Sequence, residues 1–298
     1  MPATECASYS RNDPANCHAA AWRGGLSALE IVRRWRSAGE PVARISVIQA
    51  LGSTPREEGA FMLVSAHEQT GTIGGGRLEW DCMADARLLL SEGLDRRECH
   101  IPLGPAINQC CGGAVTVLIE RIHDLEVLEA EALRDREALP TLLLFGAGHV
   151  GRALARSLAL LPLRLIWIDA RDEEFGSVPV DVEAQVTGDW EAMLDAAPAG
   201  SGVLVLTQSH TLDALIVGAA LVRDDLRYVG MIGSRTKRRR FESAFRQIDI
   251  PQMQIDKLVC PIGDFGVRDK RPEIIAAFVT AEIATRLLSE PGGSASPA

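Results

Sequence analysis

The spacing of hydrophobic and polar positions changes in a regular order along the second half of the chain. Short apolar runs, typical of buried strands, alternate there with segments in which apolar residues recur every three or four positions. The predicted strands cover 141–145, 163–168, 203–207 and 227–232, with a short extended segment at 257–259, and the predicted helices cover 150–160, 212–222, 237–247 and 272–288. Strands that alternate with helices favour a parallel sheet with helices on both faces. We therefore predict a C-terminal, doubly wound α/β domain over residues 140–290.

The first half has a different pattern, in which apolar and β-branched runs are separated by glycine loops. Its predicted strands cover 42–51, 60–66 and 114–121, and its predicted helices begin near Leu29 and Leu78. A stretch rich in Glu, Leu and Ala at 123–139 predicts a further helix, which Pro140 closes. We place the domain boundary between about 124 and 140 and predict an N-terminal α/β domain over residues 25–124. The two ends, 1–25 and 291–298, are aperiodic, and we expect them to be poorly ordered.

Composition and charge narrow the class of protein. The chain has 298 residues, enough for two cores, and its 47% hydrophobic and 24% charged residues are ordinary for a soluble globular protein. It contains neither an apolar run of about 18 residues nor a basic-then-apolar leader, so we expect no membrane span and no targeting segment. Seven irregularly spaced cysteines argue for the reducing cytoplasm rather than a disulfide framework. A net charge of −9 disfavours nucleic-acid binding.

Two adjacent cysteines in the segment Gln109-Cys110-Cys111-Gly112-Gly113 carry the first candidate chemistry. The flanking residues predict a tight turn that leads into a strand, so the thiols are expected on or beside a loop. A thiolate is a soft metal ligand and a strong nucleophile, and the two glycines let the backbone come close to whatever the sulfur binds. The alternative is that both thiols are small buried hydrophobes. Neighbouring residues of a strand point to opposite faces, so we expect at most one of the pair to face a ligand.

A glycine fingerprint opens the second domain. Gly146, Gly148 and Gly151 fit the pattern GxGxxG between an apolar strand and an amphipathic helix, and Asp169 ends the next strand. In a Rossmann-like domain the first glycine makes the tight turn, the second admits the pyrophosphate of a dinucleotide, and the third lets the helix pack on the strand. Asp169 is then the candidate for hydrogen bonds with an adenosine ribose, and Arg171 leaves NADP open beside NAD. The same fold without a nucleotide is the alternative.

The first domain has a glycine loop of its own, Gly74-Gly75-Gly76-Arg77, before a predicted helix. Successive N–H groups in such a loop form an anion-binding concavity, and Arg77 adds a two-pronged cation. Glu79 has two interpretations: it favours the helix dipole, or it hydrogen-bonds a polar heterocycle.

A similar polar loop with one arginine covers 52–56. Together the two loops predict a pocket for a phosphorylated ligand, with Cys110 or Cys111 at its reactive end. The sequence leaves open whether these segments meet in space.

Three further features are weaker. His210 and Asp213 lie in the turn after a predicted strand, where a His–Asp pair serves as a base or a metal ligand, or more commonly caps a helix. The basic run 235–240 is either a solvated helix face or an anion contact, with Ser234 as the helix N-cap. Cys260 is expected to be a buried structural thiol.

Taken together, these motifs resemble the XdhC/CoxI family, the accessory factors of molybdenum hydroxylases such as xanthine dehydrogenase. The matching segments are GSTPR at 52–56, GTIGGGRLE at 71–79, QCCGG at 109–113, GAGHVG at 146–151, YVGMIGSRTKRRR at 228–240 and VCPIG at 259–263. Each segment is weak by itself, but six in the family's order are specific. Two positions depart from the expected pattern. Ile107-Asn108 replaces a leucine and a glycine, and Gln208 replaces a histidine, which weakens a metal or acid–base role for that turn.

The resemblance implies a chaperone rather than a turnover enzyme. It implies binding of the molybdenum cofactor, a pterin phosphate (molybdopterin) that chelates Mo through a dithiolene, and protection of it while a cysteine desulfurase replaces an oxo ligand with sulfide. It further implies delivery to the large subunit of a xanthine dehydrogenase-type molybdenum hydroxylase. Carried over to this chain, a cysteine of QCCGG contacts the cofactor, with Cys110 as the candidate Mo contact. Monomer and homodimer both remain open.

Two other functions compete with this one. The first is an NAD(P)-dependent oxidoreductase that uses the C-terminal domain, for which thiols in the other domain have no obvious purpose. The second is a redox switch at Cys110 and Cys111. A disulfide between neighbouring residues requires a strained ring, which disfavours the switch.

Overall fold

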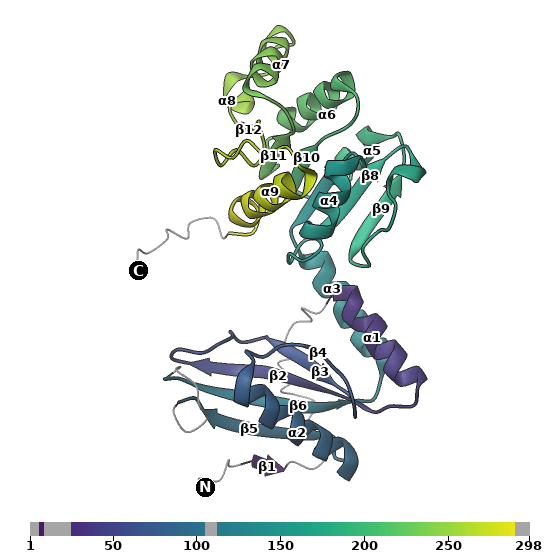
Figure 1. Cartoon of the computed structure of the whole chain (residues 1–298), viewed down its shortest axis with the longest axis vertical. Coiled ribbons are helices and arrows are strands. Elements are labelled where there is room, and N and C mark those ends of the chain that lie inside the picture. Colours follow the sequence, from purple (N-terminus) through teal and green to yellow (C-terminus); the bar gives the residue numbers. More distant parts are fainter. Residues whose placement is uncertain (1–5, 9–24, 105–111, 290–298) are drawn as a thin grey trace. The chain divides into compact units, whose positions relative to one another are not determined.

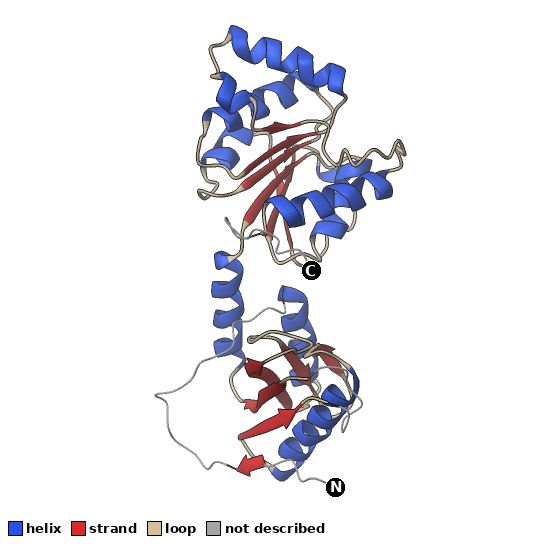
Figure 2. Ribbon diagram, turned by 90° about the vertical axis from the view of Figure 1, so that its left-hand side faces the viewer, coloured by secondary structure: helices blue, strands red, loops and turns tan. Residues whose placement is uncertain are grey.

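The structure is a computed structural model, and it describes residues 6–8, 25–104 and 112–289. Figure 1 labels the elements, and Figure 2 shows that each half of the chain contains one sheet with helices packed on it. The ends that we expected to be poorly ordered lie almost entirely outside the described residues, and so do Gln109, Cys110 and Cys111. None of the described helices is both long and apolar enough to cross a membrane.

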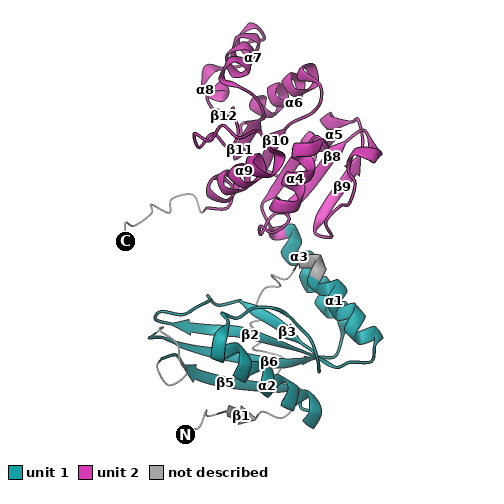
Figure 3. Cartoon of the chain, in the orientation of Figure 1, with its two compact units in different colours: residues 1–137 teal, residues 138–298 magenta. Residues whose placement is uncertain are grey.

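The chain divides into two compact units, residues 1–137 and 138–298 (Figure 3). The division falls inside the 123–139 stretch, where the sequence placed the boundary. The helix of that stretch, α3 (Leu125–Ala138), buries Leu128 and Ala132 in a core of the first unit. It therefore belongs to the N-terminal unit rather than to a free linker.

The N-terminal unit is built on a six-stranded antiparallel sheet in the order β1-β5-β6-β2-β3-β4. Its strands are β1 (Cys6–Ser8), β2 (Val42–Leu51), β3 (Phe61–Val64), β4 (Gln69–Gly71), β5 (Arg96–Pro102) and β6 (Ala114–Ile122). The sequence predicted β2, β3 and β6 but not the other three. Those three are short or polar, and in β5 only Cys99 is buried.

Helices cover both faces of this sheet. Helix α2 (Gly76–Glu92) packs on one face through Leu78, Ala86 and Leu89, and α1 (Gly25–Ser37) packs with α3 on the other through Leu29 and Trp35. Strand β3 reflects this arrangement, because alternate residues of a strand point to opposite faces. Its side chains at 62 and 64 join the α2 core, and those at 61 and 63 join the α1 core.

The C-terminal unit has a six-stranded parallel sheet in the order β12-β11-β10-β7-β8-β9, which confirms the predicted doubly wound fold. Its strands are β7 (Thr141–Phe145), β8 (Arg164–Asp169), β9 (Val182–Val186), β10 (Gly202–Val205), β11 (Tyr228–Met231) and β12 (Leu258–Val259). The order reverses between β7 and β10, so the crevice between them, beyond their carboxyl ends, is where such folds bind ligands.

Helices lie on both faces of the parallel sheet (Figure 2), and each face has its own core. The helices are α4 (His149–Leu158), α5 (Trp190–Asp195), α6 (His210–Val222), α7 (Arg235–Gln247), α8 (Gln252–Ile255) and α9 (Pro272–Arg286), and a 3-10 turn covers Asp172–Glu174. One core contains Ile216 from α6 and Phe245 from α7. The other contains Leu154 from α4 and Val279 and Ile283 from α9.

Candidate functional site

The loop that joins β2 to β3 contacts both glycine motifs of the N-terminal unit. Leu51 pairs with Ala114 in register, so the residues just after Leu51 and just before Ala114 meet. A Cβ placed on Gly113 would lie 2.2 Å from the carbonyl oxygen of Leu51 and 2.7 Å from that of Ser53. On its other side the loop contacts Gly74, where a Cβ would lie 2.5 Å from Pro55 Cγ. The described residues of the segments 52–56, 71–79 and 109–113 thus lie together.

The paired cysteines themselves, with Gln109, lie outside the described residues. The segment that contains them leaves and re-enters the described chain at neighbouring points, because Leu103 N–H donates to Gly113 O at 2.8 Å. Gly112, which follows the second cysteine, is exposed. The described residues on either side of this segment, Leu103 and Gly113, are thus neighbours, and Gly113 lies beside the 52–56 loop.

The Glu79 side chain accepts hydrogen bonds from the backbone of the glycine loop. Its Oε1 accepts the N–H groups of Ile73, Gly74 and Gly75 at 2.9, 3.2 and 2.8 Å, and it also accepts the hydroxyl of Thr72. Burial acts to raise the pKa of Glu79, but the hydrogen bonds from Thr72 and the loop N–H groups outweigh it, and the pKa lies below its ordinary value. The concavity predicted for an external anion holds a carboxylate of the chain itself, a role that neither sequence interpretation of Glu79 included.

Arg77, predicted to add charge to that loop, is engaged elsewhere. Its Nε lies 2.8 Å from Asp81 one turn along α2, and its side chain is 65% exposed. Gly76, the first residue of α2, has φ +65°, which suits glycine. The arginine that lines a cavity in this unit is Arg56 instead.

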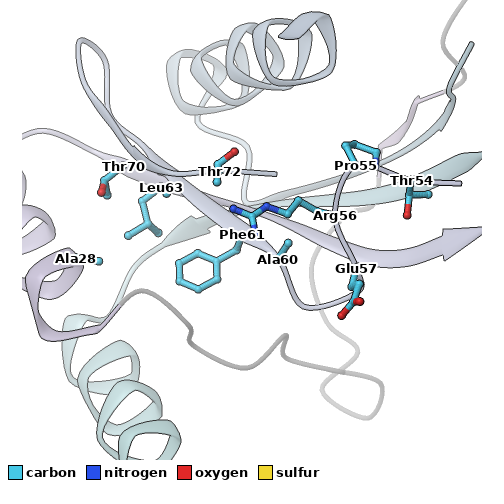
Figure 4. A pocket seen from close by; sticks show the side chains of 11 residues that line it. Ala28, Thr54, Pro55, Arg56, Glu57, Ala60, Phe61, Leu63, Thr70 and Thr72 are labelled. Carbon is cyan, nitrogen blue, oxygen red and sulfur yellow. The ribbon is translucent and has the colours of Figure 1, made fainter. Parts of the chain in front are cut away.

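The cavity measures about 580 Å³ and lies between α1, the 54–57 loop and the β3–β4 edge of the sheet (Figure 4). A volume of that size falls within the range of small-molecule sites. Its described lining combines apolar side chains with hydroxyl and charged groups, and it comprises Ala28, Thr54, Pro55, Arg56, Glu57, Ala60, Phe61, Leu63, Thr70, Gly71 and Thr72.

In the C-terminal unit the three fingerprint glycines have different surroundings. A Cβ on Gly146 would lie 2.3 Å from Leu206 O, and a Cβ on Gly151 would lie 2.1 Å from Gly146 O. Both positions therefore require glycine for the packing of the protein itself. A Cβ on Gly148, at the N-cap of α4, would meet no atom within 4 Å.

Asp169, the predicted ribose contact, is already hydrogen-bonded. It accepts Ala147 N–H at 2.7 Å, Arg171 N–H at 3.0 Å and the Arg171 guanidinium at 2.9 Å. Burial acts to raise its pKa, but the Arg171 side chain and the backbone N–H groups outweigh it, and the pKa lies below the ordinary value. Arg171 also donates to Gln208 at 2.9 Å, across the carboxyl ends of the strands. The cavity there measures about 100 Å³, small beside the roughly 300–1,000 Å³ of ordinary ligand sites.

Sequence reasoning missed a buried ion pair in this unit. Asp213 is fully buried and accepts Lys237 Nζ at 2.8 Å, together with the N–H and hydroxyl of Thr207 at 3.0 and 2.8 Å. His210 is 79% exposed, with Nδ1 3.8 Å from the same carboxylate. Lys237 is therefore not part of a solvated helix face, although Ser234 does cap α7 as predicted. The order of the strands could have indicated this pair, because Asp213 and Lys237 follow two strands, β10 and β11, that are neighbours in the sheet.

Two other buried groups hold the last loop. Burial raises the pKa of Cys260 to about 11, so the thiol is protonated and buried, as the sequence predicted. Tyr228 hydroxyl donates to Glu282 at 2.5 Å, and the same carboxylate accepts Gly263 N–H at 3.2 Å. Among residues 25–104 and 112–289, no cluster of three or more His, Cys, Asp or Glu side chains is arranged to hold a metal ion.

Two family models match this chain, and similar proteins include one from Escherichia coli and one from Bacillus halodurans. The model of the XdhC and CoxI family matches residues 35–100, and that of the XdhC Rossmann domain matches residues 142–283. The Escherichia coli K12 protein YqeB, described as uncharacterized, is 29% identical over 262 residues, which are 85% of this chain and 45% of YqeB. This chain thus spans about half the length of that relative.

A protein from Bacillus halodurans, whose crystal structure is described as that of a xanthine dehydrogenase, has a similar fold. The TM-score is 0.68 at 21% identity, and the likeness covers 90% of this chain and 98% of that one. At that identity the likeness shows the fold alone. Because it covers 90% of this chain, the likeness extends over parts of both units.

Proposed function

The chain belongs to the XdhC and CoxI family, and from that membership we propose that it is a molybdenum cofactor chaperone. It binds molybdopterin-bound molybdenum as cargo, protects it while a cysteine desulfurase supplies the terminal sulfide, and delivers it to the large subunit of a xanthine dehydrogenase-type molybdenum hydroxylase. This work takes place in the reducing cytoplasm, where a thiol remains available.

One observation carries the proposal. Gly113, directly after the paired thiols and one further glycine, packs against the backbone of the 52–56 loop, and that loop also borders the 580 Å³ cavity. The described residue that follows the QCCG segment thus contacts a loop that borders a space large enough for a small molecule, which supports a cargo site in this unit. A thiolate suits a thiophilic metal such as molybdenum.

A carrier needs tight binding without chemistry of its own. One or two reactive contacts and a pocket meet that need, and a complete set of acid–base groups is not required. Glu79 and Asp169 each accept backbone N–H groups of one glycine loop, so both carboxylates are engaged in internal hydrogen bonds. This arrangement supports a structural role for both, in shaping the loops.

The test is retention of molybdopterin by single cysteine variants, each purified from a host that makes the cofactor. We expect one of the variants Cys110→Ala and Cys111→Ala to abolish retention and the other to leave it nearly intact, because neighbouring residues of a strand point to opposite faces. Cys110→Ala is the variant that we expect to lose the cofactor. Cys82→Ala, which removes a buried thiol of α2 in the same unit, is the control and should retain the cofactor. Equal retention by Cys110→Ala, Cys111→Ala and the double variant would remove the thiols from the proposal.

An NAD(P)-dependent oxidoreductase is the second candidate, and the open space beside Gly148 favours it. Against it stand the narrow crevice and the engaged Asp169 carboxylate. Incubation with NADH or NADPH and a panel of carbonyl compounds separates the two functions. Turnover that survives replacement of both Cys110 and Cys111 would favour the oxidoreductase.

A further inference from the structure

The lining of the cavity in the N-terminal unit combines apolar and polar side chains. Phe61, Leu63 and Ala28 are apolar, and Arg56 and the threonines are polar. Thr70 and Thr54 lie at opposite ends of the lining, with Arg56 between them (Figure 4). A small number of polar groups placed on a largely apolar pocket is the usual composition of a site for a small organic ligand. A volume of about 580 Å³ is large enough for a fused two- or three-ring heterocycle with a short phosphorylated side chain.

Arg56 is the cation of this cavity. Its side chain extends from the loop towards Phe61, whereas the neighbouring Glu57 points away from it (Figure 4). Within the described part of the chain, Arg56 has no hydrogen-bond or ion-pair partner, while Arg77 is paired with Asp81 and Arg44 with two glutamates. Its planar guanidinium therefore keeps all its donors for a ligand, and that geometry matches a phosphate group in two-pronged fashion.

The threonine hydroxyls of the lining differ in whether they already make hydrogen bonds. Thr72 donates to Glu79 and accepts Gly74 N–H, so it is engaged in the glycine loop. The hydroxyls of Thr54 and Thr70 make no side-chain hydrogen bond within the described residues. A hydroxyl both donates and accepts, which suits the mixed edge of a polar heterocycle. Glu79 acts here as a positioning residue, because it holds the loop that carries Thr72.

From this lining we propose that the cavity binds the phosphorylated pterin of the cargo, with Arg56 on the phosphate and Thr70 on the heterocycle edge. The proposal rests on the proposed function and adds to it the subsite that recognises the organic part of the cofactor. It also assigns the phosphate to Arg56 rather than to the glycine loop, whose N–H groups Glu79 occupies.

The experiment compares two ligands on the full chain, molybdopterin and its dephosphorylated form, by anaerobic equilibrium dialysis. Wild type should bind the phosphorylated form about tenfold or more tightly, the strength of a hydrogen bond to a charged group. Arg56→Gln should bind both forms equally, and Arg56→Lys should recover part of the preference because it keeps the charge without the fork. Arg77→Gln is the matched control and should behave as wild type.

Each outcome separates this inference from the proposed function. If Arg56→Gln still prefers the phosphorylated form as strongly as wild type does, the inference is wrong and the chaperone function stands. The same holds if Arg56→Gln loses affinity for both forms by the same factor, because the preference is then unchanged. Failure of wild type to bind either ligand would overturn both. Urea unfolding of Arg56→Gln at the wild-type midpoint checks that the exposed substitution leaves the fold intact.

Discussion

At the scale of single residues, the glycines of the 146–151 loop are required for different reasons. A methyl group at Gly146 or Gly151 would overlap a backbone carbonyl, whereas one at Gly148 would meet open space. The packing of the protein explains the first and third glycines. The second remains unexplained by the protein's own atoms, and in dinucleotide-binding folds it is the position that the pyrophosphate approaches.

This difference predicts opposite results for two alanine variants. Gly151→Ala should lower the free energy of unfolding by about 1–3 kcal/mol or more, because its Cβ must displace a backbone carbonyl. Gly148 has an ordinary φ of −66°, so Gly148→Ala should change the free energy of unfolding by less than about 1 kcal/mol. Chemical denaturation measures both. Equal destabilisation by the two variants would contradict the packing assigned to this loop.

The Asp213–Lys237 pair marks what residue patterns alone do not reveal. Each residue has an ordinary interpretation in the sequence, one as a helix cap and the other as part of a basic helix face. The pair forms only because β10 and β11 are adjacent and parallel, which brings the turns after them together. Removal of one partner from such a pair leaves an uncompensated buried charge, at a cost of about 3–5 kcal/mol.

At the scale of elements, α2 and the glycine loop before it form one hydrogen-bonded unit through Glu79. The carboxylate in the first turn of the helix reaches back to three loop N–H groups. It therefore takes the place of a side-chain N-cap, which Gly75 lacks. The loop that borders the cavity is shaped by the helix that follows it.

This unit predicts a pH dependence. The pKa of folded Glu79 lies below the ordinary value of 4.5, so its stabilising contribution is complete above that pH and is lost as the pH falls through the lower, folded pKa. Glu79→Gln should therefore unfold about 1–3 kcal/mol more easily than wild type near neutrality, and the difference should shrink below about pH 4.5. Urea unfolding of both proteins across this range measures it. A difference that grows on acidification would contradict the hydrogen bonds described.

The elements found from the sequence are those with a buried, apolar pattern. Strands β7, β8, β10 and β11 are apolar on both faces, and the alternation with helices fixed their parallel order. Strands β5 and β9 were missed because each has a single buried residue, so no period of two is visible. The N-terminal loops were found as motifs. Their mutual contact was not, because it depends on the pairing of β2 with β6 and β3.

At the scale of the whole molecule, the two units have separate cores. The antiparallel sheet is covered by α1, α2 and α3, and the parallel sheet by helices of the C-terminal half alone. A chain segment with its own core folds independently as a rule. The proposed cargo site lies entirely in the first unit, and the fingerprint crevice lies entirely in the second.

Residues 138–298 expressed alone should therefore fold. We expect a cooperative urea transition and dispersed NMR amide signals, since both faces of the parallel sheet stay covered. The fragment should retain no molybdopterin, because it lacks the cavity and the thiols. A fragment without a cooperative transition would show that the N-terminal unit is needed to complete its core.

The most direct measurement of the central claim is the amount of molybdopterin that the full chain retains. The protein is purified from a host that synthesises the cofactor, and the bound pterin is quantified per polypeptide by its fluorescence after oxidation, with molybdenum measured in parallel. We expect a substantial fraction of polypeptides to carry the pterin, and a matched host without cofactor synthesis to yield none. Pterin at the background level in both preparations would contradict the chaperone function.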